Sequence, residues 1–137
     1  WLDPLFSCGH WTPELVDIAG GIEPLAKVGE RSRRISLDEL HQVNPDVILI
    51  ACCGFSIART MQDIPAFTSI PTIASLRCVR AGQVFITDGS AYFSRPGPRL
   101  VDSLEILAHA LDPEHQLLPA FLQGSLHRPN DSMATTR

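Results

Sequence analysis

The stretch Asn44–Gly54, with the sequence NPDVILIACCG, contains a continuous apolar run between two chain-breaking signals. Asn44 and Pro45 interrupt whatever precedes the run, and Gly54 ends it. The residues between, Val47–Cys53, are apolar and rich in β-branched side chains. Such a run is typical of a strand buried on both faces, as in a parallel sheet covered by helices. The sequence therefore predicts an α/β architecture.

A helix is predicted immediately before this strand. Ser36 stands at the N-cap position, and Glu39 three residues later completes a capping box. Leu37, Leu40 and Val43 have the spacing of one inward-facing side. We expect the helix to run from the first to the last of these apolar residues.

A second, earlier helix is predicted in the segment TPELVDIAGG. Thr12 would be its N-cap, Pro13 its first helical residue and Glu14 an acidic residue of its first turn. Gly20 and Gly21 would end it. We read these glycines as a C-cap and not as a phosphate-binding loop, because they follow a helix and do not open one.

The rest of the chain continues the alternation of helices and strands. The segments that we interpret are SIARTMQDI as a helix ending near Pro65, IPTIASL as a short strand, AGQVFITDG as a second strand, and Leu100 to about Leu111 as a long helix. The last helix would bury a stripe of leucines, Leu100, Leu104, Leu107 and Leu111, before Asp112 and Pro113 stop it.

The predicted order is that of one Rossmann-like lobe. We expect a mostly parallel sheet of about four to five strands, flanked by helices and closed by the long C-terminal helix. Residues 1–115 would form this single domain, because 137 residues are enough for one core and too few for two ordinary domains. Residues 116–137 are polar and aperiodic, and we predict a disordered tail there.

Composition excludes several classes of function. The formal net charge of −4 argues against non-specific nucleic-acid binding, and the basic cluster Arg31, Arg33 and Arg34 is interpreted as a solvated loop. No apolar run reaches the length of a membrane helix. Since the sequence also shows no nucleophile elbow, phosphate loop, dinucleotide fingerprint or zinc-protease motif, we expect no enzyme.

Cysteines and histidines give no metal-site pattern. The four cysteines lack C-x-x-C spacing, and Cys52 and Cys53 end the apolar strand, where small buried thiols are common. Cys8 and Cys78 could pair in an oxidising compartment, which the sequence leaves open. The five histidines are scattered, and only His10 attracts interest because it precedes Trp11 in a turn. We therefore predict no metal ligands.

Two loops that carry aromatic residues precede helices and form the candidate site. The first is Phe6–Trp11, and the second contains Tyr92, Phe93 and Arg95 between the second strand and the last helix. In an open parallel sheet, loops at the carboxyl ends of the strands line the ligand crevice. Aromatic rings there offer stiff apolar area, and Arg95 offers an oriented polar contact. The alternative is that Trp11 and Phe93 only cap the core.

Three segments in the order WLDPLFSCGHWTPELVDIAGG, RRISLDELHQVNPDVILIACCGF and VRAGQVFITDGSAYFSRPGPRLVDSLEILAHAL carry a family resemblance. The chain resembles the C-terminal lobe of the periplasmic binding proteins that serve ABC importers of cobalamin and ferric siderophores, most closely the cobalamin-binding branch. The resemblance spans about Trp1 to Pro113. It implies a binding protein without catalysis, for cobalamin or a related metal chelate, and a periplasmic location.

The resemblance also implies roles for individual residues. His10, Trp11, Phe55, Tyr92, Phe93 and Arg95 would line this lobe's half of the ligand cleft. An exposed carboxylate of each lobe pairs with arginines of the membrane permease in this family, which points to Asp38, with Glu39 as its neighbour. For Glu39 a capping-box role stays open, and for Asp38 that of a solvated first-turn acid.

The chain departs from the family in showing one lobe, no linking helix and no leader. We expect either a fragment of a longer binding protein, with a missing N-terminal lobe as partner, or a truncated descendant with weak affinity. A cytoplasmic location therefore stays open. Two other hypotheses remain: an interaction-only α/β domain, and a nucleotide-binding enzyme domain on a similar fold.

Overall fold

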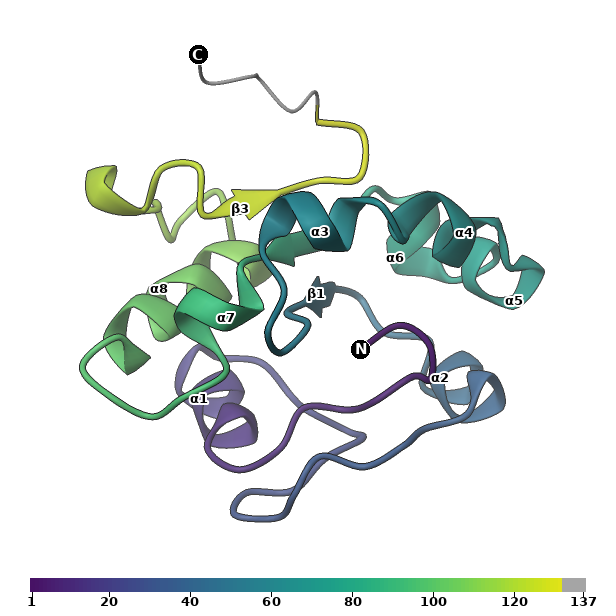
Figure 1. Ribbon diagram of the computed structural model, residues 1–137, viewed down its shortest axis with the longest axis horizontal. Helices are drawn as coiled ribbons and strands as arrows, with labels where there is room; N and C mark the ends of the chain where they lie inside the picture. The colour runs from purple at the N-terminus through teal and green to yellow at the C-terminus, as the bar shows by residue number, and fades with distance from the viewer. Residues whose placement is uncertain (132–137) are drawn as a thin grey trace.

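A small central sheet organises the chain, and helices lie on both of its faces (Figure 1). The computed structural model describes residues 1–131. Its α-helices are α1 (Thr12–Ile18), α2 (Leu37–Val43), α3 (Ile57–Met61), α4 (Ile64–Ser69), α5 (Pro71–Ala74), α6 (Arg77–Arg80), α7 (Gly89–Tyr92) and α8 (Leu100–Leu111). Its strands are β1 (Ile48–Ile50), β2 (Val84–Thr87) and β3 (Leu126–His127), and the 3-10 helix η1 spans Ala120–Leu122. The predicted α/β class is confirmed.

The sheet has the order β1-β2-β3 and is mixed. β1 and β2 run parallel, with Leu49 opposite Phe85, whereas β3 pairs antiparallel to β2, with His127 opposite Ile86. The expected sheet of four to five strands is therefore wrong for the described residues, which form three. β1 is also shorter than the apolar run that predicted it.

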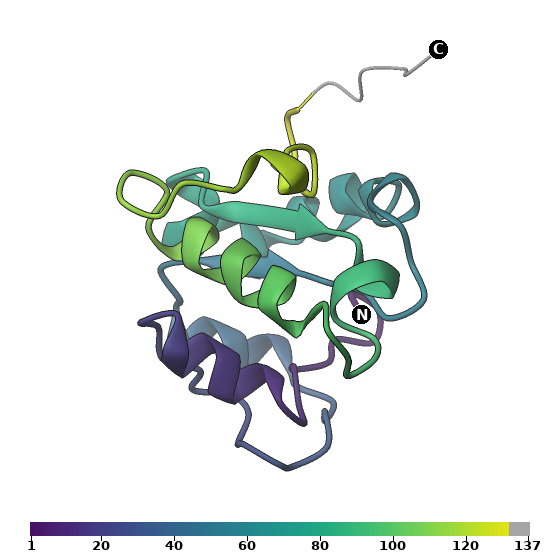
Figure 2. The same cartoon turned by 90° about the vertical axis from the view of Figure 1, so that its left-hand side faces the viewer.

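Alternation along β1 divides the core into two layers. Ile48 and Ile50 pack into a cluster formed with α2 and α3–α6. Leu49 and Ala51 point to the other face and pack with residues of α1 and α8. Figure 2 shows α8 crossing one face of the sheet with α1 beside it. This two-sided burial is the environment that the continuous apolar run predicted.

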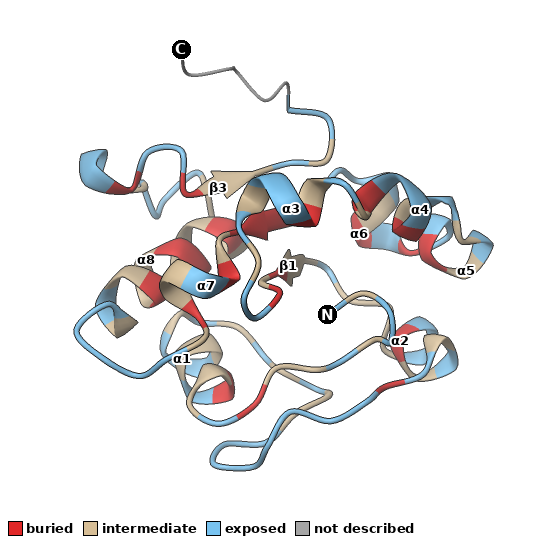
Figure 3. Ribbon diagram, in the orientation of Figure 1, coloured by how far each residue is buried: buried red, intermediate tan, exposed pale blue. Residues whose placement is uncertain are grey.

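Buried positions concentrate around the strands and on the inner sides of the helices, as Figure 3 shows. In contrast, residues 27–34, which lead toward α2, are all exposed. The basic cluster in this segment is therefore solvated, as expected. No helix of residues 1–131 is long and apolar enough to cross a membrane.

The segment IPTIASL forms a helix and not the predicted strand. Pro71 is the first residue of α5, where its fixed φ angle favours the helical turn, and Ile70 before it is extended. Ile70, Ile73 and Leu76 recur every three residues, and the last two are completely buried. The β-branched composition suggested a strand, but a spacing of three places these side chains on one side of a helical turn.

Most of the predicted tail is ordered. β3 pairs with β2, and the Thr87 hydroxyl donates a hydrogen bond of 2.7 Å to the carbonyl oxygen of Ser125. Leu122 is only 2% exposed and packs in the same cluster as α8. The prediction of disorder is thus wrong for this part of the chain, whereas residues 132–137 lie outside the described residues.

Helix boundaries follow their local signals, with two corrections. The capping box at Ser36 is present, so α2 begins as predicted. α1 instead includes Thr12, and its N-cap is Trp11, which makes no side-chain cap bond. The segment SIARTMQDI divides into α3 and the start of α4.

The buried side of α8 differs from the predicted leucine stripe. Its buried residues are Ser103, Ile106, Leu107 and Ala110. Small side chains at Ser103 and Ala110 allow close packing, whereas three of the four predicted leucines are only half-buried at the margin of this side. The helix itself is confirmed from its first to its last predicted residue.

Candidate functional site

The loops that leave β1 and β2 meet at the carboxyl ends of the two parallel strands. The N–H of Gly54 donates to the Ser94 hydroxyl at 3.4 Å, and the N–H of Ser90 donates to the Phe55 carbonyl at 3.4 Å. Figure 2 shows that α7, the start of α1 and the N-terminus all lie at the end of the sheet to which the β2 arrow points. The crevice position expected for an open α/β sheet therefore gathers three separate segments.

Gly89 makes the close approach of these loops possible. A Cβ atom at this position would lie 2.2 Å from the carbonyl oxygen of Cys52, far inside van der Waals contact. Asp88, one residue earlier, caps α7 by accepting a 2.8 Å bond from the N–H of Ala91. Only glycine fits this contact, which lets the backbones of the two loops lie directly against each other.

The β1 loop carries an aromatic and cationic group. The ring of Trp1 lies 5.3 Å from that of Phe55, and the guanidinium of Arg59 lies 4.4 Å above the same ring. Arg59 also pairs with Asp63 at 2.8 Å. Because the Trp1 side chain is 50% exposed, this group presents aromatic area to solvent next to a fixed positive charge.

The β2 loop also places an arginine beside an aromatic ring. The guanidinium of Arg99 lies 5.7 Å from the centre of the Tyr92 ring, and Arg95 between them is exposed. Ser103 of α8 fixes the loop, since its hydroxyl contacts the carbonyl oxygens of Tyr92 and Arg99. The loop thus holds Tyr92 half-buried and leaves Arg95 exposed to solvent.

Phe93 is different from its neighbours. It is 9% exposed and belongs to the core cluster that contains Ile106 and Leu107. The Phe93 ring packs under the β2 loop and caps the core, which is the alternative to ligand binding that the sequence had left open. We therefore leave Phe93 out of the candidate surface.

The loop before α1 is held tightly by its backbone. His10 has a positive φ of 57°, and its N–H donates to the Glu30 carbonyl at 2.6 Å. The His10 ring is exposed and lies 5.7 Å from that of Trp11. The indole N–H of Trp11 is buried and finds no acceptor among residues 1–131. This loop borders the same end of the sheet, but no contact of the described residues joins the rings of Trp11 and Tyr92.

The two acidic residues at the start of α2 have different environments. Glu39 accepts a 2.8 Å bond from the N–H of Ser36 and pairs with Arg33 at 2.8 Å. These contacts, the Ser36 N–H first, lower the pKa of its carboxyl group. Asp38 is exposed and has no hydrogen bond or ion pair among the described residues. Glu39 therefore stabilises the helix, whereas the carboxylate of Asp38 is not engaged by the described residues.

All four cysteines are free thiols. Cys8 donates to a carboxylate oxygen of Glu23 at 3.4 Å, and burial raises the pKa of its thiol. Burial also raises the pKa of Cys78, which is completely buried. Cys8 and Cys78 are thus not paired with each other in this structure.

Sequence reasoning missed two members of the surface. Trp1 is brought to Phe55 only by the tertiary fold, and nothing in the sequence indicates that contact. Arg59 could have been found, because it stands four residues after Phe55 and four before Asp63, the spacing of neighbours on a helix.

Comparison with protein-family models gives no match, and no curated protein is significantly similar to this chain.

Proposed function

We propose that this protein is a solute-binding lobe of an ABC importer, that it binds cobalamin or a related metal chelate, and that it delivers this ligand to a membrane permease. The observation that carries the proposal is the joint surface at the carboxyl ends of β1 and β2. There the rings of Trp1 and Phe55 lie 5.3 Å apart on the β1 loop, and Tyr92 lies beside Arg99 on the β2 loop. The Gly54–Ser94 and Ser90–Phe55 hydrogen bonds join the two loops.

The chemistry of these groups suits a large, flat ligand. Aromatic rings bury apolar area with little loss of conformational entropy, and guanidinium groups bind carboxylates and phosphates. Neither group transfers protons readily at neutral pH. We therefore propose binding without catalysis, and we expect an extracytoplasmic location by family resemblance.

The supporting position for permease docking is Asp38. Its carboxylate is exposed and uncommitted, whereas that of Glu39 is held by Ser36 and Arg33. An arginine of a permease could pair with Asp38 without disrupting the cap of α2. The permease-docking role comes from the family resemblance, and the local geometry favours Asp38 over Glu39 for it.

Isothermal titration of the protein with cyanocobalamin, a ferric siderophore and haem tests the proposal. We expect one of these to bind in the micromolar range, because a surface on one side of the ligand buries less area than an enclosed cleft. Trp1 and Trp11 are the only tryptophans, so binding should also change the tryptophan fluorescence.

The matched variants are Trp1→Ala and Phe121→Ala. Both remove an exposed aromatic ring, but Phe121 lies in η1, after α8, and is 75% exposed. Trp1→Ala should weaken ligand binding, and Phe121→Ala should leave it unchanged. If none of the three ligands binds at concentrations well above micromolar, the result would favour the interaction-only alternative.

A further inference from the structure

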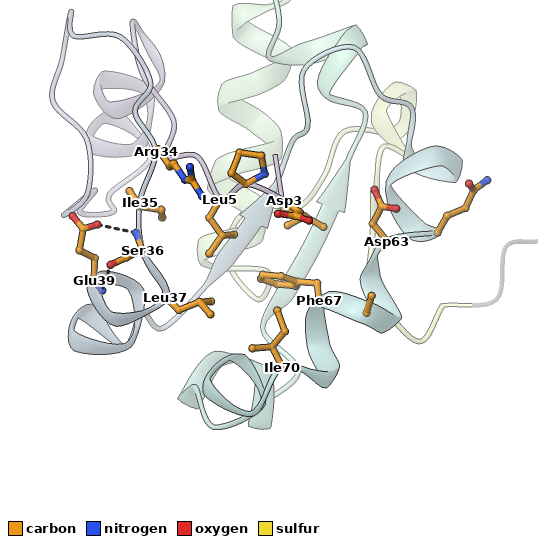
Figure 4. A pocket seen from close by; sticks show the side chains of 14 residues that line it. Asp3, Leu5, Arg34, Ile35, Ser36, Leu37, Glu39, Asp63, Phe67 and Ile70 are labelled. Carbon is orange, nitrogen blue, oxygen red and sulfur yellow. Dashed lines mark hydrogen bonds between the residues drawn. The ribbon is translucent and has the colours of Figure 1, made fainter.

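A concavity lies on the other side of the N-terminal segment from α1. It has a volume of about 810 Å³ and lies between residues 2–5, residues 34–39 and residues 62–70 (Figure 4). Its volume falls in the range of roughly 300–1,000 Å³ that is typical of small-molecule sites. We call it the α4 groove, because α4 forms one of its walls.

The floor of the α4 groove is apolar. Leu5, Phe67 and Ile70 point into it from opposite sides, as Figure 4 shows. Phe67 is 5% exposed and belongs to the main core, so its ring is held in place. A ligand seated here would bury its own apolar surface against fixed side chains.

The charged groups at its margin are unevenly distributed. Asp63 lies toward one end and Asp3 lies between it and Leu5, whereas Arg34 and Glu39 lie at the other end (Figure 4). Asp63 is neutralised by Arg59 at 2.8 Å, but Asp3 has no hydrogen bond or ion pair among residues 1–131. One end of the groove is thus acidic, with a carboxylate that is uncommitted.

We propose that the α4 groove binds small apolar amines, with the ammonium group at the Asp3–Asp63 end and the apolar body over Phe67. The carboxylates favour a positively charged ligand, and the apolar floor favours burial of its apolar body. This site does not depend on the proposed function, since it shares no residue with the chelate surface.

Dansylcadaverine tests the proposal, because its fluorescence rises in apolar surroundings and its chain ends in an ammonium group. Its counterpart is dansyl-6-aminohexanoate, which has the same dansyl group and a carboxylate at the end. We expect the amine to bind several-fold more tightly than the acid, with a preference that declines as salt is added. Equal binding of the two probes, or binding of neither at millimolar concentration, would overturn the proposal.

Two substitutions move the affinity in opposite directions. Asp3→Asn should weaken binding of the amine by about threefold, the size expected of an exposed ion pair. Arg59→Gln should strengthen it by a similar factor, because it releases the carboxylate of Asp63. Because partial unfolding would increase binding of both dansyl probes, each variant is judged by the ratio of amine to acid affinity. The matched control is Asp17→Asn, an exposed acid of α1, which should change nothing. If all three variants bind the amine equally, the assignment of the acidic end is wrong.

Discussion

The loops after β1 and β2 each place an arginine over an aromatic ring, but they hold it in different ways. In the β1 loop Arg59 is part of α3 and is tied to Asp63 at 2.8 Å. In the β2 loop Arg99 follows two prolines and has no ion pair among residues 1–131. If this surface binds the proposed ligand, the difference predicts a division of roles: the charge of Arg59 is balanced by Asp63, whereas that of Arg99 is available to the ligand.

The contact that joins the two loops can be broken at Gly89. Gly89→Ala would place a Cβ atom 2.2 Å from the Cys52 carbonyl oxygen. Since backbone must move to relieve this overlap, we expect the free energy of unfolding to fall by about 3 kcal/mol, measured by urea denaturation. Gly97→Ala is the control, because a Cβ at Gly97 meets nothing within 4 Å, and it should change stability by less than about 0.5 kcal/mol. Equal effects of the two would show that the loops are not in contact.

The β2 loop alone can be loosened at Ser103. This residue is completely buried, and its hydroxyl contacts the carbonyl oxygens of Tyr92 and Arg99. Ser103→Ala should cost about 1 kcal/mol in unfolding free energy, because it removes a buried hydroxyl that donates to partly buried carbonyl groups. Ligand binding should weaken as well. Ser90→Ala removes an exposed hydroxyl of the same loop and should leave both quantities unchanged.

The smallest expected effect concerns the different roles of Arg59 and Arg99. For an anionic chelate such as haem, Arg99→Gln should weaken binding about two- to fivefold at low salt, and added salt should erase the difference. Arg59→Gln should change that affinity less, since Asp63 already balances its charge. Titration of both variants at two salt concentrations measures this. A larger salt-dependent loss for Arg59 would reverse the assignment.

Local signals predicted the elements that depend on local physics. The capping box at Ser36 and the apolar run after Pro45 led directly to α2 and β1, because caps and continuous hydrophobicity act within a few residues. β3 could not be predicted, since its two residues are strand-like only through pairing with β2. For the same reason the ordered segment around Leu122 was mistaken for a tail.

The candidate site was predictable in part for a similar reason. Loops at the carboxyl ends of strands are placed by topology, so the position of Tyr92 and Arg95 could be predicted from the sequence, whereas Phe55 was named only by the family resemblance. Phe93 stands beside Tyr92 in the chain but turns into the core, and adjacent aromatic residues do not reveal which one is buried. Trp1 joins the surface through a tertiary contact alone.

The free thiols have a practical consequence for experiments on this surface. Cys53 is exposed, whereas Cys52 and Cys78 are buried and burial raises the pKa of Cys8. Since the thiolate is the reactive form, an alkylating reagent should modify Cys53 first. Cys53 directly precedes Gly54, whose N–H bonds to Ser94, so a dye attached there would be close to the contact between the two loops. Labelling of the native Cys53 with a fluorescent dye should therefore report ligand binding without an engineered cysteine.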